Sequence, residues 1–146
     1  MFSQRIRTVM KRKKILTAPP ETTVSKAAKL MASKNVGAVM VVKDERLVGI
    51  FTERDAVFRV MALGRDAQTT PLADVMTTTP MTLDPDESFG HALLVMHENG
   101  FRHVPVIENG KPVGIVSARN ALDPEMEEFV SEAKRREHIQ KRQHAR

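Results

Sequence analysis

Residues 48–55 read VGIFTERD, and residues 113–120, which lie 65 positions further along the chain, read VGIVSARN. Each stretch joins an apolar run, typical of a strand, to a hydroxyl residue that is followed three positions later by Asp55 or Asn120. Between residues 17 and 55, 10 of 39 positions are identical at this offset of 65 without a gap. Chance alone gives about two or three identities at ordinary residue frequencies. The chain therefore contains an internal repeat.

Both copies predict the same order of elements. Residues 23–34 and 88–99 have apolar side chains at the spacing of an amphipathic helix. Thr23 suits the start of the first helix, and either Asp86 or Ser88 suits the start of the second. Asn35 and Gly100 suit the left-handed residue at the two helix ends. A short extended piece precedes each helix, at 15–17 and 81–83.

Two strands joined by a polar turn are expected after each helix. They are predicted at 38–42 and 47–51 in the first copy, and at 104–107 and 113–116 in the second. Asn109-Gly110 in the second turn is a strong hairpin signal. A further helix is expected after Thr52 and after Ser117. The sequence thus predicts an α+β fold made of two β-α-β-β-α units.

The predicted organisation runs along the chain in four parts. The first repeat, with an N-terminal helical segment, is expected over 1–63, a linker over 64–74, the second repeat over 75–122, and a C-terminal helix or tail over 123–146. Each unit of about 50 residues buries too little surface to be stable alone. We therefore expect the two copies to share a core.

The net charge of +5 is concentrated in one short segment. Residues 1–16 carry six basic and no acidic side chains, whereas residues 17–122 sum to −1 and residues 123–146 to zero. The body does not have the composition of a basic cleft for a polyanion. The absence of cysteine excludes disulfides, thiol catalysis and cysteine-ligated zinc. No run approaches 18 apolar residues and the N-terminus lacks a signal-peptide core, so we expect a cytoplasmic protein with no membrane segment.

No catalytic constellation is apparent. The sequence has no nucleophile–base pattern and no phosphate-binding loop of the P-loop type. The five histidines do not show the spacing of metal ligands. We therefore expect neither an enzyme nor a metal site.

The repeated strand-to-helix junction is the main candidate for binding. A helix start attracts phosphate, and the hydroxyl of Thr52 or Ser117 can add a hydrogen bond. The carboxylate of Asp55 can accept hydrogen bonds from the two vicinal hydroxyls of a ribose, and Gly49 and Gly114 allow a ligand or a neighbouring backbone to come close. The same pattern is equally an ordinary capping box, so both interpretations remain open.

The paired units, each ending in Gly-h-h-Ser/Thr-x-x-Asp or its Asn variant, resemble tandem cystathionine-β-synthase (CBS) domains, a Bateman module. The resemblance covers about residues 7–122 and includes the sequences at 9–10, 75–76, 35–38 and 101–106. It implies two repeats related by a pseudo-twofold axis, assembly into a homodimer, and non-catalytic regulation of an effector protein. It also implies that an adenine nucleotide, with AMP foremost among AMP, ADP, ATP, NAD and S-adenosylmethionine, binds in clefts between the repeats. No catalytic cofactor is implied.

The resemblance implies two sites, each formed by both repeats. The first site would join Thr52, Arg54 and Asp55 to Thr82, Phe101 and His103. The second would join Ser117, Arg119 and Asn120 to Thr17, Val36, Gly37 and Ala38, with Arg102 near the phosphates. Asparagine at position 120 lacks the charge of the family's aspartate. We therefore expect the Asp55 site to bind more strongly, because hydrogen bonds to charged groups are about twice as strong.

Two other functions remain open. The basic run at 11–14 could bind nucleic acid, with the repeats as a dimerisation scaffold. The near-neutral body and the lack of interleaved aromatic residues argue against this interpretation. A purely structural interaction module with degenerate sites is the third possibility.

Overall fold

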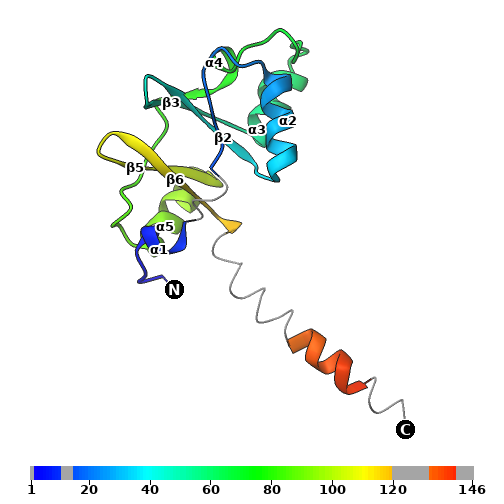
Figure 1. Cartoon of the computed structure of the whole chain (residues 1–146), viewed down its shortest axis with the longest axis vertical. Coiled ribbons are helices and arrows are strands. Elements are labelled where there is room, and N and C mark those ends of the chain that lie inside the picture. Colours follow the sequence, from blue (N-terminus) through cyan, green and yellow to red (C-terminus); the bar gives the residue numbers. More distant parts are fainter. Residues whose placement is uncertain (1, 11–14, 120–131, 141–146) are drawn as a thin grey trace.

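The computed structural model describes residues 2–10, 15–119 and 132–140 (Figure 1). The elements, in chain order, are α1 (Ile6–Val9), β1 (Thr17–Ala18), α2 (Val24–Lys34), β2 (Ala38–Lys43), β3 (Arg46–Thr52), α3 (Glu53–Asp55), η1 (Ala56–Met61), α4 (Leu72–Val75), β4 (Thr77–Thr78), α5 (Phe89–Asn99), β5 (His103–Glu108) and β6 (Lys111–Ser117). Residues 132–140 are also helical and exposed. The mixed α+β architecture predicted from the sequence is confirmed. The rest of the predicted C-terminal helix, with its start at Asp123, lies outside the described residues.

The two long helices begin and end where the sequence predicts. The hydroxyl of Thr23 accepts a hydrogen bond from the Lys26 amide, and that of Ser88 accepts one from the His91 amide. Ser88, rather than Asp86, is therefore the cap of α5. The helices end at Asn35 and Gly100, whose φ angles of 53° and 70° are left-handed.

Each repeat contributes one antiparallel hairpin. In the first, β2 pairs with β3 within a four-stranded sheet of order β1-β2-β3-β4, and in the second, β5 pairs with β6. Both hairpins have a two-residue turn with positive φ, at 44–45 and at 109–110. The second is the predicted Asn-Gly turn. The first adopts the same left-handed geometry with Asp44 and Glu45, which carry a larger steric cost there than glycine.

The two hydrophobic cores exchange their leading helices. Ile6 and Met10, at the ends of α1, are buried in the core of the second repeat with Phe89. Leu72 and Val75 of α4 are buried in the core of the first repeat. In Figure 1, α1 accordingly lies beside α5, although β1 and α2 follow it in the chain.

The sequence grouped the N-terminal helical segment with the first repeat and counted the beginning of α4 as linker. Main-chain hydrogen bonds join each leading helix to the repeat on which it packs: the Ile6 amide donates to the Glu87 carbonyl at 2.9 Å, and the Leu72 amide donates to the Thr22 carbonyl at 2.8 Å. Leu72 and Val75 of α4 complete the first core, and α1 occupies the equivalent position on the second core. Neither core is complete without the leading helix of the other repeat.

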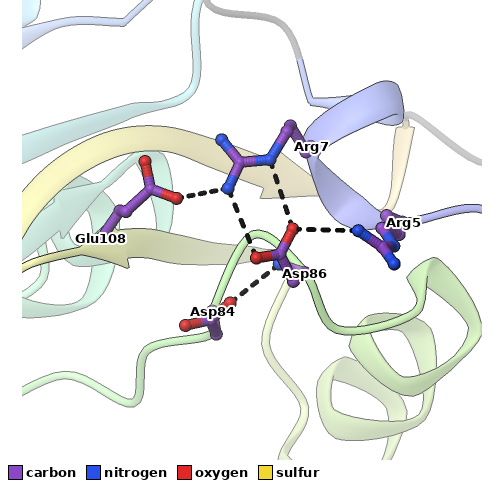
Figure 2. A network of polar contacts seen from close by, with 5 residues as sticks. All are labelled: Arg5, Arg7, Asp84, Asp86 and Glu108. Atoms are coloured by element: carbon purple, nitrogen blue, oxygen red, sulfur yellow. Dashed lines mark hydrogen bonds and ion pairs between the residues drawn. The ribbon is translucent and has the colours of Figure 1, made fainter.

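Ion pairs on the surface fix the orientation of α1 (Figure 2). Arg7 Nε lies 3.3 Å from Asp86 Oδ1, and the same guanidinium also pairs with Glu108. Arg5 Nη1 lies 3.6 Å from Asp86 Oδ1. Hydrogen bonds to Glu108 and Asp86 raise the pKa of Arg7 above its ordinary value. Exposed pairs of this kind contribute little stability each, so the burial of Ile6 is the main contribution to docking.

Among the helices of the described part of the chain, none combines the length and the apolar character that crossing a bilayer requires.

Candidate functional site

The junction of β3 and α3 forms a reciprocal capping box. The Thr52 amide donates to Asp55 Oδ2 at 2.9 Å, and the Asp55 amide donates to Thr52 Oγ1 at 3.4 Å. The Thr52 hydroxyl also donates to Asp55 Oδ2, at 3.2 Å. The structure therefore confirms that Thr52 and Asp55 form a helix-capping box. It does not exclude ligand binding, because a carboxylate has about four acceptor positions.

Asp55 is held on its other side by a residue that the sequence analysis did not name. Arg59 Nε lies 3.4 Å from Asp55 Oδ1, and the Asp55 side chain is only 10% exposed. The signal was present in the sequence, since an acidic and a basic residue four positions apart on a helix lie on the same face. Asp55 is thus a buried, paired carboxylate at the end of a central strand.

The starts of the helices are already engaged within the chain. The Glu53 amide donates to the Gly37 carbonyl at 3.1 Å, and the Ala118 amide donates to the Arg102 carbonyl at 3.0 Å. These two bonds are equivalent under the offset of 65. With the Asp55 amide bound to Thr52, they reduce what α3 can offer a phosphate, so side chains would have to supply much of that interaction.

Arg54 is the exposed cation nearest this junction in the chain. Its guanidinium carbon lies 4.6 Å from the centre of the Phe58 ring. Such a cation–π contact holds the side chain over η1.

The two repeats meet around His103. A Cβ placed on Gly37 would lie 3.2 Å from His103 Cε1 and 2.6 Å from Glu53 Oε1, so all three residues are in close proximity. The strands β3 and β6 also approach each other across this boundary. Burial lowers the pKa of His103, while the neighbouring Glu53 opposes that shift.

This contact joins residues that the sequence analysis assigned to different sites. Gly37 was expected in the second site and His103 in the first, yet the two residues are neighbours. The sequence missed the contact because a glycine shows no preference for a partner. A side chain on residue 37 would displace the end of the flexible Glu53 side chain and press on His103.

The remaining candidates differ in exposure. Ala38 is buried and pairs with Thr52, whereas Val36 and Ser117 are half-buried. The exposed candidates are Thr17, Thr82, Phe101, Arg102 and Arg119. Asn120 lies outside the described residues. Within the described ranges, no group of three or more His, Asp or Glu side chains is arranged to hold a metal ion.

Gly49 and Gly114, which precede the two junctions, are each covered by a methionine. A Cβ on Gly49 would lie 2.5 Å from Met76 Sδ and 2.9 Å from the Thr77 carbonyl oxygen. A Cβ on Gly114 would lie 2.5 Å from Met10 Sδ. Of the two roles the sequence allowed for these glycines, the structure shows close approach of a neighbouring segment. The leading helices therefore end directly on the strands that carry the two junctions.

The family model of the CBS domain matches residues 6–62 and 72–124, which are the two repeats with their leading helices. The chain belongs to the CBS domain family. The resemblance seen in the sequence is thereby confirmed, and this chain is a tandem pair of CBS domains.

Curated relatives agree with this assignment. The CBS domain-containing protein YhcV of Bacillus subtilis is 38% identical over 103 residues, covering 70% of this chain and 73% of that protein. Other relatives are much longer: the match to the meiotically up-regulated gene 70 protein of Schizosaccharomyces pombe is 42% identical but spans only 14% of that protein.

Solved structures agree as well. An uncharacterized conserved protein from Pyrococcus horikoshii has a TM-score of 0.79 at 30% identity, covering 86% of this chain and 94% of that one. A CBS domain protein from Pyrobaculum aerophilum, solved in complex with AMP, has a TM-score of 0.73 at 26% identity, covering 80% and 89%.

Proposed function

We propose that this CBS-domain pair is a non-catalytic regulatory module that binds an adenine nucleotide, AMP foremost, between its repeats. The observation that carries the proposal is the buried carboxylate of Asp55, which is held in the capping box that follows β3, two residues after Glu53, which lies near His103 of the other repeat. The AMP complex of the Pyrobaculum protein supports the choice of ligand. The ligand state would be transmitted to a partner protein, as the resemblance implies.

The first proposed site follows from the chemistry of its residues. Asp55 would accept a hydrogen bond from a ribose hydroxyl, and Thr52 and Arg54 would face the phosphate. Phe101, which is exposed, and His103, which is half-buried with a lowered pKa and therefore favours the neutral form, would lie against the adenine. Thr82 completes this set.

The second site is proposed to bind more weakly. It would comprise Ser117, Arg119, Asn120, Thr17, Val36, Gly37 and Ala38, with Arg102 near the phosphates. Gly37, proposed for this second site, lies near His103, proposed for the first. Binding at one site would therefore change the ligand affinity of the other.

The proposal predicts a stabilisation by AMP that depends on Asp55. At a concentration about 100 times the dissociation constant, AMP is expected to stabilise the folded protein by about 2.7 kcal/mol. Asp55→Asn, which copies the residue at position 120, should lose most of this ligand-induced shift because it removes the charged acceptor. The measurement is a thermal unfolding series with AMP, each variant being compared with its own ligand-free baseline because Asp55 also caps a helix.

Asp44→Asn is the matched control, since it makes the same chemical change in the turn at the opposite end of the β2–β3 hairpin. Asparagine is tolerated at the positive φ of that position. An unchanged AMP response in Asp55→Asn would contradict the placement of the site. A wild-type protein that AMP, ADP, ATP, NAD and S-adenosylmethionine all fail to stabilise at millimolar concentration would contradict the function itself.

We also propose that the chain forms a homodimer through η1. Four apolar side chains on or just after this helix are exposed: Val57, Phe58, Met61 and Leu63. Contiguous exposed apolar residues of this kind commonly mark an interface.

Met61→Glu tests the interface, because Met61 is 73% exposed and a buried, unpaired charge would oppose association. Light scattering should find a dimer for the wild type and a monomer for Met61→Glu. Leu94→Glu is the control, because Leu94 is 51% exposed on α5, away from η1 in sequence. A monomeric wild type, or a dimer that tolerates Met61→Glu, would contradict this interface.

The nucleic-acid alternative stays a prediction, because the basic run at 11–14 lies outside the described residues. Deletion of residues 1–14 does not test it cleanly, since Ile6 and Met10 would be lost from the second core. Neutralising the four bases at 11–14 and measuring the salt dependence of binding is the cleaner experiment.

A further inference from the structure

Arg59 connects the buried carboxylate of Asp55 to the end of α4. Its Nε lies 3.4 Å from Asp55 Oδ1. Its Nη1 donates to the carbonyl of Met76 at 3.1 Å and to that of Val75 at 3.4 Å. A cation on the last carbonyls of a helix is favourable, because those groups carry partial negative charge.

The segment that Arg59 holds is the connection to the second repeat. Met76 covers Gly49, and the next two residues form β4, which pairs with β3. Thr82, a proposed member of the same site, follows six residues after Met76. Arg59 therefore contacts both the carboxylate from the first repeat and the segment that leads to the second.

The second repeat lacks this arrangement in its sequence. At the offset of 65, Asp55 corresponds to Asn120 and Arg59 to Pro124, so neither charge is present there. The leading helix of the second core, α1, is oriented instead by ion pairs of Arg7 with Asp86 and Glu108 (Figure 2). In the first repeat, one side chain thus links the docked helix α4 to a site carboxylate, and the sequence of the second repeat has neither charge at the equivalent positions.

We propose that Arg59 is the positioning residue of the Asp55 site, and that it couples nucleotide binding there to the docking of α4. This inference rests on the function proposed above. The Arg59 guanidinium holds Oδ1 and Thr52 holds Oδ2 through two hydrogen bonds, so the carboxylate keeps one orientation and has about one acceptor position left for the ribose. Because coupling between two equilibria is reciprocal, a ligand that favours this orientation also stabilises the end of α4 on β3.

The test compares Arg59→Gln with Arg59→Lys, Arg7→Gln and the wild type, with AMP as the probe. We expect Arg59→Gln to bind AMP about threefold to fivefold more weakly, the range expected for a half-exposed ion pair. In the wild type, AMP should slow hydrogen exchange at the amides of residues 76–78, and this slowing should be absent in Arg59→Gln. Lysine keeps the charge but lacks the planar fork that reaches Asp55 and the carbonyls together, so Arg59→Lys should recover only part of both effects.

Arg7→Gln is the matched control. It loosens the other leading helix without touching Asp55, and so should leave the AMP affinity unchanged. If Arg59→Gln lowers thermal stability but keeps wild-type affinity and the AMP-dependent slowing, Arg59 has only a structural role and the inference is wrong. If Arg59→Gln does not fold, Arg59→Lys decides: an AMP affinity and an AMP-dependent slowing of exchange that both equal those of the wild type would also overturn the inference. A wild type that binds none of AMP, ADP, ATP, NAD and S-adenosylmethionine overturns the proposed function, and this result is distinct from both outcomes above.

Discussion

Ile6→Ala is expected to lower the free energy of unfolding by about 2–5 kcal/mol, the range for removing a large aliphatic side chain from a core. Ile6, the sixth residue of the sequence, is fully buried because α1 packs on the second core beside Phe89. Urea denaturation monitored by circular dichroism measures the change. Leu94→Ala removes a similar volume from a half-exposed position and should change the stability by no more than about 0.5–1 kcal/mol.

The location of the amides that lose protection from hydrogen exchange in Ile6→Ala tests the exchange of leading helices. The amides of Phe89 and Gly90 donate to the carbonyls of Gln4 and Phe2, so they should exchange faster with solvent in Ile6→Ala. The amide of Ser25, which donates to the Ala67 carbonyl in the first repeat, should be affected much less. Equal or greater loss of protection at Ser25 would contradict the assignment of α1 to the second core.

Gly49→Ala is expected to destabilise the protein by about 1–3 kcal/mol, as overpacking of a filled core does. The new methyl group would lie 2.9 Å from the Thr77 carbonyl oxygen as well as 2.5 Å from Met76 Sδ. The thioether can rotate away, but the carbonyl belongs to β4, which is hydrogen-bonded to β3. The backbone must therefore shift, and thermal or urea unfolding should report the cost.

Gly114→Ala is the matched comparison at the equivalent position. There the nearest atoms all belong to the flexible Met10 side chain, so the cost should be smaller than at Gly49. A penalty at position 114 equal to or greater than that at position 49 would show that the Thr77 carbonyl is not the obstacle.

Local structure was largely predictable because its causes lie within a few residues. The apolar spacing, Thr23 and Ser88 as caps, and Asn35 and Gly100 as left-handed ends define α2 and α5 without reference to the rest of the chain. The same holds for the Asn109-Gly110 hairpin. The turn at Asp44 and Glu45 was predicted only as a polar turn, since its positive φ angles are imposed by the pairing of β2 with β3.

The candidate site was predictable only in part. The repeated motif identified Thr52 and Asp55, and their capping box is a local feature. Arg59 could have been named from its spacing to Asp55, but its bonds to the end of α4 depend on how α4 docks. The resemblance assigned Gly37 and His103 to different sites, and their proximity depends on how the two repeats pack together.

By itself, the sequence determined the duplication and the order of helices and strands, because periodicity, caps and turn residues act over short distances. Its repeated motif also carried the resemblance to the CBS family. Only the tertiary structure decided which core each leading helix completes and which residues meet at the Asp55 junction. Those outcomes depend on the burial of Ile6 against residues 83–116 and of Leu72 against residues 16–60, in each case in the other repeat, so local spacing along the chain does not determine them. The methionines over Gly49 and Gly114 are the clearest case. Met76, at the start of the second repeat, covers a glycine of the first, and Met10, at the start of the first repeat, covers a glycine of the second.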